Sequence, residues 1–187
     1  MRRRDFLTLL GGTALWPVVA RAQPRDVPRR VGILAPFPDD QDPQVQAYLS
    51  AFKQRLRELG WIETRNIQLD IRFTGQDANR IRAGAEELIA LSPNLIVVWA
   101  NPALAILRDA AKDMPIVFVT VSDPVGSGFV TNLAHPGGNL TGFENFQTPI
   151  GGKWLEVLKD IAPEVRRIAF IHNPEIAAHI AFVRAAQ

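Results

Sequence analysis

Short apolar runs alternate with stretches of helical spacing along residues 31–121. The runs predict strands because they are short, apolar and rich in β-branched residues. Between them, apolar residues recur every three or four positions, which is the spacing of one helix face. The expected strands are 31–35, 67–73, 95–99 and 116–121, and the expected helices are 45–59, 81–89 and 101 to about 112.

This order of elements predicts a parallel sheet whose strands are joined by right-handed crossovers. Most of the strands are apolar almost throughout, which indicates that helices cover both faces of the sheet. Residues 67–73 instead alternate between apolar and polar positions, so we expect that strand near an edge. The predicted fold class is α/β, with a doubly wound parallel sheet as an N-terminal lobe over residues 31–145.

The pattern loosens within the last part of this lobe. Residues 122–139 are rich in the turn-forming residues Pro, Gly, Asp and Asn, which punctuate secondary structure. Residues 140–143 form a short apolar-rich run. We expect that run to be the last strand of the lobe, followed by a crossover.

Residues 146–187 are expected to be an incomplete second α/β lobe. The pattern predicts a helix that ends before Pro163, a strand at 167–171 and a helix that begins at Pro174. A single strand cannot form a stable sheet, which needs about three strands or other cover. Several apolar side chains of this segment should therefore stay partly exposed: Trp154, Leu155, Leu158, Ile168 and Phe170.

The first 22 residues are typical of an export signal. A basic start, a short apolar stretch and Ala20-Arg21-Ala22 match a secretory signal peptide, cleaved after Ala22. Arg3-Arg4-Asp5-Phe6-Leu7 fits the twin-arginine pattern, so that route is favoured, and the general secretory route stays open. Residues 6–20 are too short and too interrupted for a membrane anchor. We therefore expect an unanchored protein in the periplasm.

The basic charge of the chain belongs largely to this signal. The signal holds four of the 21 basic and one of the 19 acidic residues, which leaves 17 basic and 18 acidic residues. Such a near-neutral chain does not favour nucleic-acid binding, which needs a basic face. The chain has no cysteine, which excludes disulfides and thiolate metal sites. Its three histidines lack metal-ligand spacing, and residues 23–30 are expected to be a polar tether.

Candidate ligand-binding residues come from the expected loops at one edge of the sheet. In an open parallel sheet, ligands bind beyond the carboxyl ends of the strands. The expected loops at that edge are 36–40, 100–103, 122–124 and 144–146. Their candidate residues are Phe37, Asp40, Asn101, Ala103, Ser122, Asp123 and Asn145.

The candidates with the clearest chemistry also have structural alternatives. Asn101 opens a helix, where free N–H groups favour a carboxylate, but it could simply cap that helix, with Pro102 at the first helical position. Phe37 could stack on an apolar ligand or only cover the core. Asp123 could pair with a ligand ammonium group or form a turn. Asp40 lies in an acidic loop that is more simply interpreted as a solvated surface.

Motifs of common catalytic and cofactor sites are absent from the sequence. The loop after the first strand lacks the glycine fingerprint of dinucleotide binding. The chain also has no phosphate-binding loop and no nucleophile elbow, as hydrolases of this sheet class would have. A catalytic interpretation would start from Asp123 or Glu144, and neither has a visible partner. We therefore expect a binding protein without a cofactor or metal, and not an enzyme.

A block from 123 to 142 and several shorter segments carry a resemblance to a known family. They are Asp123-Pro124-Val125, Gly128-Phe129-Val130, Leu133, Pro136-Gly137-Gly138-Asn139-Leu140-Thr141-Gly142, Ile116-Val117-Phe118, Gly151-Gly152-Lys153-Trp154-Leu155-Glu156, Ile161-Ala162-Pro163 and Asn173-Pro174. These segments resemble the substrate-binding proteins of ABC transporters, in the branch that includes tryptophan-binding members. The resemblance extends over nearly the whole chain.

The resemblance implies a type I periplasmic binding fold, in which two α/β lobes hold a ligand in the cleft between them. It also implies uptake of a small solute, with amino acids as the usual ligands, and its transfer to an ABC permease in the inner membrane. Two local departures are visible. Thr64 stands where the family usually has glycine, and residues 99–102 form a shorter loop without the family's small hydroxyl residues.

The largest departure from the family is the short second lobe. We expect a truncated solute-binding protein, with weak or no ligand binding by this chain alone. The alternative is a periplasmic sensory or interaction module that docks through its exposed partial lobe.

Overall fold

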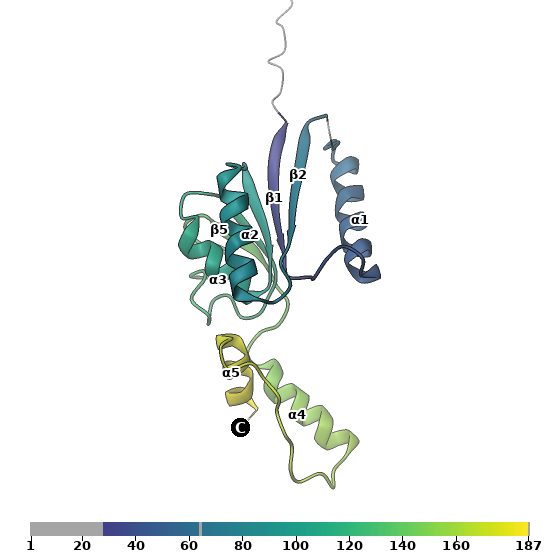
Figure 1. Ribbon diagram of the computed structural model, residues 1–187. Helices are drawn as coiled ribbons and strands as arrows, with labels where there is room; N and C mark the ends of the chain where they lie inside the picture. Colours follow the sequence, from purple (N-terminus) through teal and green to yellow (C-terminus); the bar gives the residue numbers. More distant parts are fainter. Residues whose placement is uncertain (1–27, 64, 187) are drawn as a thin grey trace, which may run out of the picture.

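The structure is a computed structural model that describes residues 28–63 and 65–186. The expected export signal, most of the expected tether and Thr64 lie outside these residues. The described elements (Figure 1) are β1 (Arg29–Ala35), α1 (Pro43–Glu58), β2 (Ile67–Phe73), α2 (Ala78–Ala90), β3 (Leu95–Trp99), α3 (Asn101–Ala110), β4 (Ile116–Val121), β5 (Leu140–Glu144), α4 (Ile150–Ile161) and α5 (Ala177–Ala185).

The sheet is parallel throughout, with the strand order β2-β1-β3-β4-β5. This arrangement confirms the predicted α/β class and places β2, the alternating segment, at an edge. β1 and β3 are neighbours although β2 lies between them in the sequence, as a sheet built from crossovers requires. The carboxyl ends of all the strands therefore meet at one edge.

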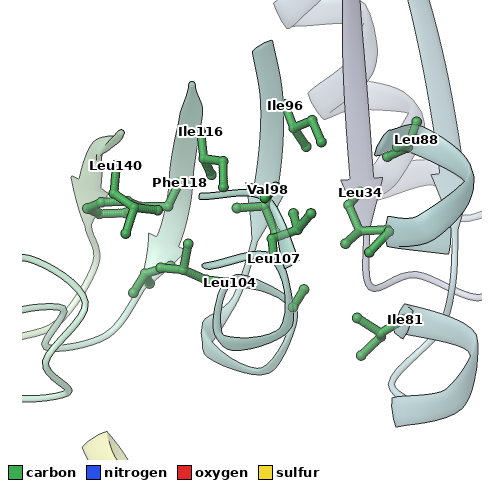
Figure 2. Close-up of a cluster of buried hydrophobic side chains, with 14 of the residues drawn as sticks. Leu34, Ile81, Leu88, Ile96, Val98, Leu104, Leu107, Ile116, Phe118 and Leu140 are labelled. Atoms are coloured by element: carbon green, nitrogen blue, oxygen red, sulfur yellow. The ribbon is translucent and has the colours of Figure 1, made fainter. Parts of the chain in front are cut away.

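Helices α2 and α3 pack on one face of the sheet, and their apolar side chains interdigitate with those of the strands (Figure 2). Burial of a Leu, Ile or Phe side chain stabilises a fold by roughly 1.5–3 kcal/mol. This layer therefore holds the strands, including their carboxyl ends, in place. The labelled core residues are Leu34, Ile81, Leu88, Ile96, Val98, Leu104, Leu107, Ile116, Phe118 and Leu140.

Helix α1 lies on the opposite face of the sheet (Figure 1). Its Phe52 and Leu56 pack against a second buried cluster around Ile33. Among the described residues, the part of this face formed by β4 and β5 stays open, because Val117 is only half-buried and Phe143 is 73% exposed. The predicted cover on both faces is therefore complete on one face and partial on the other.

Strand β1 includes the last two residues of the expected tether. The Arg29 N–H donates to the Asn66 carbonyl at 2.9 Å, and the Arg30 N–H donates to Asn94 Oδ1 at 2.8 Å. Arg30 Nε also lies 3.2 Å from Asp70 Oδ2. These contacts give the backbone of both residues partners on neighbouring segments, so the strand begins at Arg29.

Helices α4 and α5 pack on each other beyond the carboxyl edge of the sheet (Figure 1). The two backbones come so close that a Cβ on Gly151 would lie 2.1 Å from the Phe182 carbonyl oxygen. Among the described helices, none is both long and apolar enough to cross a membrane.

The prediction of a strand at 167–171 is wrong, because this segment has neither strand nor helix structure. Strand hydrogen bonds need a second strand, and all described strands belong to the first lobe.

The last helix begins at Ala177 and not at Pro174, because Asn173 Oδ1 accepts the Glu175 N–H in a turn. Five apolar side chains of residues 146–187 were expected to be partly exposed. This is confirmed, and among the five the exposure is largest at Trp154 (40%) and Ile168 (43%).

Candidate functional site

A cavity of about 370 Å³ lies between the carboxyl edge of the sheet and the α4–α5 pair, and we call it the edge cavity. Its volume is within the range of small-molecule sites. The first lobe lines it with Ala100, Asn101, Pro102, Thr120, Ser122 and Asn145. The rest of the chain lines it with Phe146, Trp154, Phe170, Ile171, His172, Ile176, His179 and Phe182.

The polar wall of the edge cavity is one hydrogen-bond network. Asn101 Nδ2 donates to the Ser122 carbonyl at 2.8 Å, and the Ser122 N–H donates to Asn101 Oδ1 at 2.9 Å. Ser122 Oγ donates to Asn145 Oδ1 at 2.8 Å. Each side-chain amide oxygen thus accepts one hydrogen bond within the network, and amide N–H groups of Asn101 and Asn145 are left over. The wall therefore offers amide N–H donors to a ligand.

The prediction that Asn101 is the N-cap of α3 is wrong. The N-cap is Ala100, and no side chain caps the helix. The Asn101 side chain is directed to Ser122 instead, because that contact satisfies a backbone donor and a backbone acceptor at once. Since Pro102 has no N–H and Ala103 is buried outside the cavity lining, the N–H of the first turn that belongs to a donor residue of the lining is that of Asn101, and no side chain caps it. Such a helix end favours an anionic group.

The backbone around this wall is strained at several positions. Ala100, Thr120 and Asp123 have positive φ angles of 68°, 51° and 44°, a region that non-glycine residues seldom adopt. The pairing of β4 with β5 also shifts register between Phe118 and Val121. Each strained residue costs of order 1–3 kcal/mol, and such strain clusters at functional sites. The strained residues lie beside the edge cavity, at the ends of β3 and β4.

Aromatic rings form the opposite wall. Trp154 lies 6.1 Å from Phe146, 6.1 Å from Phe170 and 5.7 Å from Phe182, measured between ring centroids. These separations are typical of favourable aromatic pairs. Trp154 keeps 40% of its surface exposed, so the cluster offers ring surface to a ligand as well as packing on itself.

The lining of the edge cavity contains no Asp, Glu, Lys or Arg. Its titratable side chains are His172 and His179. His179 Nδ1 accepts a hydrogen bond from the Asn173 N–H at 3.3 Å, which places the proton of the neutral ring on Nε2. The cavity thus combines dipolar donors and aromatic surface, without a permanent charge.

The structure brings three of the seven predicted site residues together in this cavity: Asn101, Ser122 and Asn145. Asp123 is engaged elsewhere, because its carboxylate accepts hydrogen bonds from the Gly126 N–H and from the Thr148 hydroxyl. It therefore forms a turn and contacts the segment that leads into α4, as the structural alternative predicted.

The other three predicted residues also lie outside the edge cavity. Ala103 is buried in the core beneath the first turn of α3. Phe37 is half-buried in the loop after β1, where its carbonyl accepts the Gly75 N–H at 2.8 Å. Asp40 is exposed and accepts a hydrogen bond from the Gln41 side chain at 2.7 Å.

Sequence reasoning did not assign the aromatic and histidine wall to the site. Trp154 and Phe170 carried a signal, since they were expected to be apolar and partly exposed in a segment too short to bury them. His172 and His179 were considered only as metal ligands. Their place at the edge cavity depends on how α5 folds back toward the sheet (Figure 1).

Most of the chain matches one family of known proteins. The model of the family described as ABC transporter substrate binding protein matches residues 32–187. The chain belongs to this family. It is 28% identical over 133 residues to the "Tyrosine-binding protein" of Clostridioides difficile strain R20291, an alignment that covers 71% of this chain and 38% of that protein. The resemblance seen in the sequence is thereby confirmed.

Solved structures of other proteins share the fold of this chain. A conserved domain protein from Vibrio cholerae has a TM-score of 0.73 at 26% identity, over 84% of this chain and 52% of that one. The ABC domain from Streptococcus pneumonia, solved in complex with L-Trp, has a TM-score of 0.73 at 24% identity, over 85% and 52%. The chain therefore spans about half the length of these solved proteins.

Proposed function

We propose that this chain holds a small amino-acid-like solute for an ABC uptake transporter in the periplasm. The edge cavity carries the proposal, because a member of a substrate-binding family here has donors on one wall and open aromatic surface on the other. The name of the Clostridioides difficile relative supports an aromatic amino acid as the ligand. Periplasmic location is supported by the export-signal pattern of residues 1–22, and the partner would be the inner-membrane permease.

The geometry suggests how such a solute would lie. Its carboxylate would accept hydrogen bonds from Asn145 and from the uncapped first turn of α3. Its side chain would lie against Trp154 and the neighbouring rings, which favour a flat apolar group. Because Trp154 leaves this wall partly open to water, we expect the chain alone to bind weakly.

Calorimetry and thermal-shift assays with tyrosine, tryptophan, phenylalanine and aliphatic amino acids test the proposal. Trp154→Ala should abolish the binding of aromatic amino acids. Trp61→Ala is a matched control, because Trp61 is 38% exposed, close to the 40% of Trp154, but lies outside the edge cavity. Equal loss in both variants, or no binding of any aromatic amino acid at millimolar concentration, would contradict the proposal.

A second function, docking to another protein chain such as a second copy of this one, is favoured by the apolar surface of α4 and the segment that follows. Val157 is 54%, Ile161 77% and Ile171 97% exposed. Clusters of exposed apolar residues mark interaction surfaces. Sedimentation of the chain distinguishes the two functions: a defined dimer that Ile161→Glu dissociates supports docking, whereas a monomer that binds amino acids supports the solute-binding function.

A further inference from the structure

The amino edge of the sheet carries cations and exposed apolar side chains close together, and we call this surface the amino-edge patch. We infer that the patch binds the surface of a membrane that contains anionic phospholipids. The inference goes beyond the proposed function and does not depend on which solute the chain holds. The patch comes from the start of β1, the last part of α1 and the turn between α1 and β2, and its members are Arg29, Lys53, Arg57, Leu59, Trp61, Ile62, Glu63 and Arg65.

The turn between α1 and β2 holds its apolar side chains in place by backbone hydrogen bonds. Gly60 follows α1 with a φ of 85°, which glycine adopts without strain. The Trp61 N–H donates to the Leu56 carbonyl at 2.8 Å. The Asn66 side chain accepts the Ile62 N–H at 2.7 Å and donates to the Gly60 carbonyl at 2.9 Å. The exposure of Trp61 and Ile62 is therefore set by a well-bonded turn.

Three apolar side chains of this turn remain open to water. Leu59 is 59%, Trp61 38% and Ile62 40% exposed. Trp61 and Ile62 also line a groove of about 180 Å³, which is smaller than the usual site of a small molecule. Neighbouring exposed apolar residues mark an interaction surface, and the small groove favours a broad partner over a buried small molecule.

Positive charge gathers on the patch although the chain as a whole is close to neutral. The patch has four basic residues and one acidic residue, whereas the chain without its expected export signal has 17 basic and 18 acidic residues. Lys53 Nζ lies 3.2 Å from Glu63 Oε2, so these two charges offset each other. Arg29, Arg57 and Arg65 are exposed and make no ion pair with another described residue. Three guanidinium groups are therefore available to an anionic partner.

An anionic membrane surface fits this combination of groups. Each Lys or Arg close to such a surface strengthens binding by roughly fivefold. Tryptophan is enriched at membrane–water interfaces, because its ring is apolar and its N–H can stay near water. The cations of the patch belong to three separate segments and surround apolar side chains, which suits a broad layer of lipid headgroups.

The patch and the edge cavity lie at opposite ends of the sheet. In Figure 1 the amino ends of β1 and β2 and the end of α1 are at the top, and the α4–α5 pair is at the bottom. The loop between β1 and α1, at the carboxyl edge, contains Asp39, Asp40 and Asp42. This separation of charge would orient the molecule at an anionic surface, with the patch toward the membrane and the edge cavity directed away from it.

Co-sedimentation of the full chain with lipid vesicles tests the inference. Vesicles of phosphatidylglycerol mixed with phosphatidylcholine are compared with vesicles of phosphatidylcholine alone. We expect at least about tenfold tighter binding to the anionic vesicles, and weaker binding as salt is added. Because residues 1–22 are also basic, the deciding comparison is between variants that all retain them.

A pair of double variants separates the patch from the overall charge. Arg57→Glu with Arg65→Glu should weaken binding to the anionic vesicles by about tenfold or more. Arg166→Glu with Arg167→Glu is the matched control, because it changes the net charge equally at exposed residues between α4 and α5. The control should change the affinity by less than about threefold. Unchanged melting temperatures confirm that both variants are folded.

Brominated phosphatidylglycerol locates the contact, because it quenches tryptophan emission at short range. Quenching should be weaker in Trp61→Phe than in the original chain. Trp154→Phe should keep the quenching, because Trp154 lies on α4 beyond the opposite edge of the sheet.

Three outcomes would overturn the inference: equal losses in the two double variants, equal binding to both kinds of vesicle, or quenching that Trp61→Phe leaves unchanged. Binding of poly-glutamate without binding of vesicles would also overturn it, and would assign the patch to an acidic protein segment. Solute binding is measured separately, so each of these outcomes leaves the proposed function standing.

Discussion

Asn101 joins two parts of the cavity wall through one amide group. Its nitrogen and oxygen bind the carbonyl and the N–H of Ser122, which fixes the end of β4 to the start of α3. Ser122 is 9% exposed, so water cannot easily replace these bonds. Only an amide side chain carries a donor and an acceptor side by side in this way.

Asn101→Ala should therefore destabilise the lobe. Both backbone groups of Ser122 would lose their partner, and the free energy of unfolding should fall by about 2 kcal/mol or more. Asn145→Ala is the control, because Asn145 is exposed and contributes a single bond to the Ser122 hydroxyl; its loss should stay below about 1 kcal/mol. Urea unfolding followed by circular dichroism measures both, and equal losses would contradict the role given to Asn101.

Glu58 at the end of α1 provides a pH-dependent prediction. Hydrogen bonds from Arg55 and then Gln54 lower the pKa of its carboxyl from the ordinary value of 4.5. The fold therefore favours the ionised form, a contribution to stability present above the ordinary pKa and lost as pH falls through the lowered one. Arg55→Gln should return the pKa toward 4.5, with a smaller effect of Gln54→Ala. NMR titration of the carboxyl carbon measures this, and a pKa unmoved by Arg55→Gln would refute the assignment.

Whether a strand can be predicted from the sequence depends on whether the fold provides a neighbouring strand for its backbone hydrogen bonds. β3 (Leu95–Trp99) has the predicted bounds, because its apolar residues lie between two neighbouring strands. Residues 167–171 have a similar pattern but no neighbouring strand, so they are irregular. The start of α3 was placed to within one residue, whereas the role of Asn101 was not predicted, because a contact 21 residues away in sequence determines it.

Gly151 tests the packing of α4 on α5. Alanine has a higher helix propensity than glycine by about 1 kcal/mol, so Gly151→Ala would stabilise an isolated α4. In the protein it should destabilise the pair, because the new Cβ would lie 2.1 Å from the Phe182 carbonyl oxygen. Hydrogen exchange of α5 amides should become faster. Gly152→Ala, with a separation of 3.0 Å from the Ala185 carbonyl oxygen, should have a smaller effect, and slower exchange in Gly151→Ala would contradict the packing.

The first lobe and the α4–α5 pair differ in how many buried contacts stabilise them. The first lobe has a five-stranded sheet with a continuous buried core on one face. The α4–α5 pair buries only Gly151, Ala178 and Phe182, and an irregular segment joins its two helices. Regions with few buried contacts open at lower free energy than the core. The α4–α5 pair should therefore unfold locally while the sheet stays intact.

Limited digestion with trypsin tests this difference. Arg166 and Arg167 are exposed in the irregular segment, whereas Arg55 and Arg57 are exposed on α1. Cleavage should occur first after Arg166 or Arg167, because a protease needs an extended backbone. Mass spectrometry should show a persistent fragment that retains the five strands. Early cleavage at Arg55 or Arg57 would contradict the proposed order of stability.

The difference between the well-packed first lobe and the α4–α5 pair also explains how much of the site could be predicted from the sequence. The rule that ligands bind at the carboxyl ends of parallel strands was sufficient to bring Asn101, Ser122 and Asn145 to one place. It could not show that Asp123 turns away, because its positive φ and its bond to Thr148 arise from the path of the chain into α4. Nor could it place Trp154, whose position depends on the packing of α4 and α5.

Trp154 also makes the edge cavity optically visible. The indole emission of a tryptophan shifts to shorter wavelength when water leaves its surroundings, and this ring is part of the cavity wall with 40% of its surface exposed. When a ligand without an indole group fills the cavity, the emission of Trp154 should therefore shift to shorter wavelength. Trp61 and Trp99 lie outside the cavity lining, so they add a constant background to that signal. Ligand binding can therefore be followed by the intrinsic fluorescence of the protein, without an attached dye.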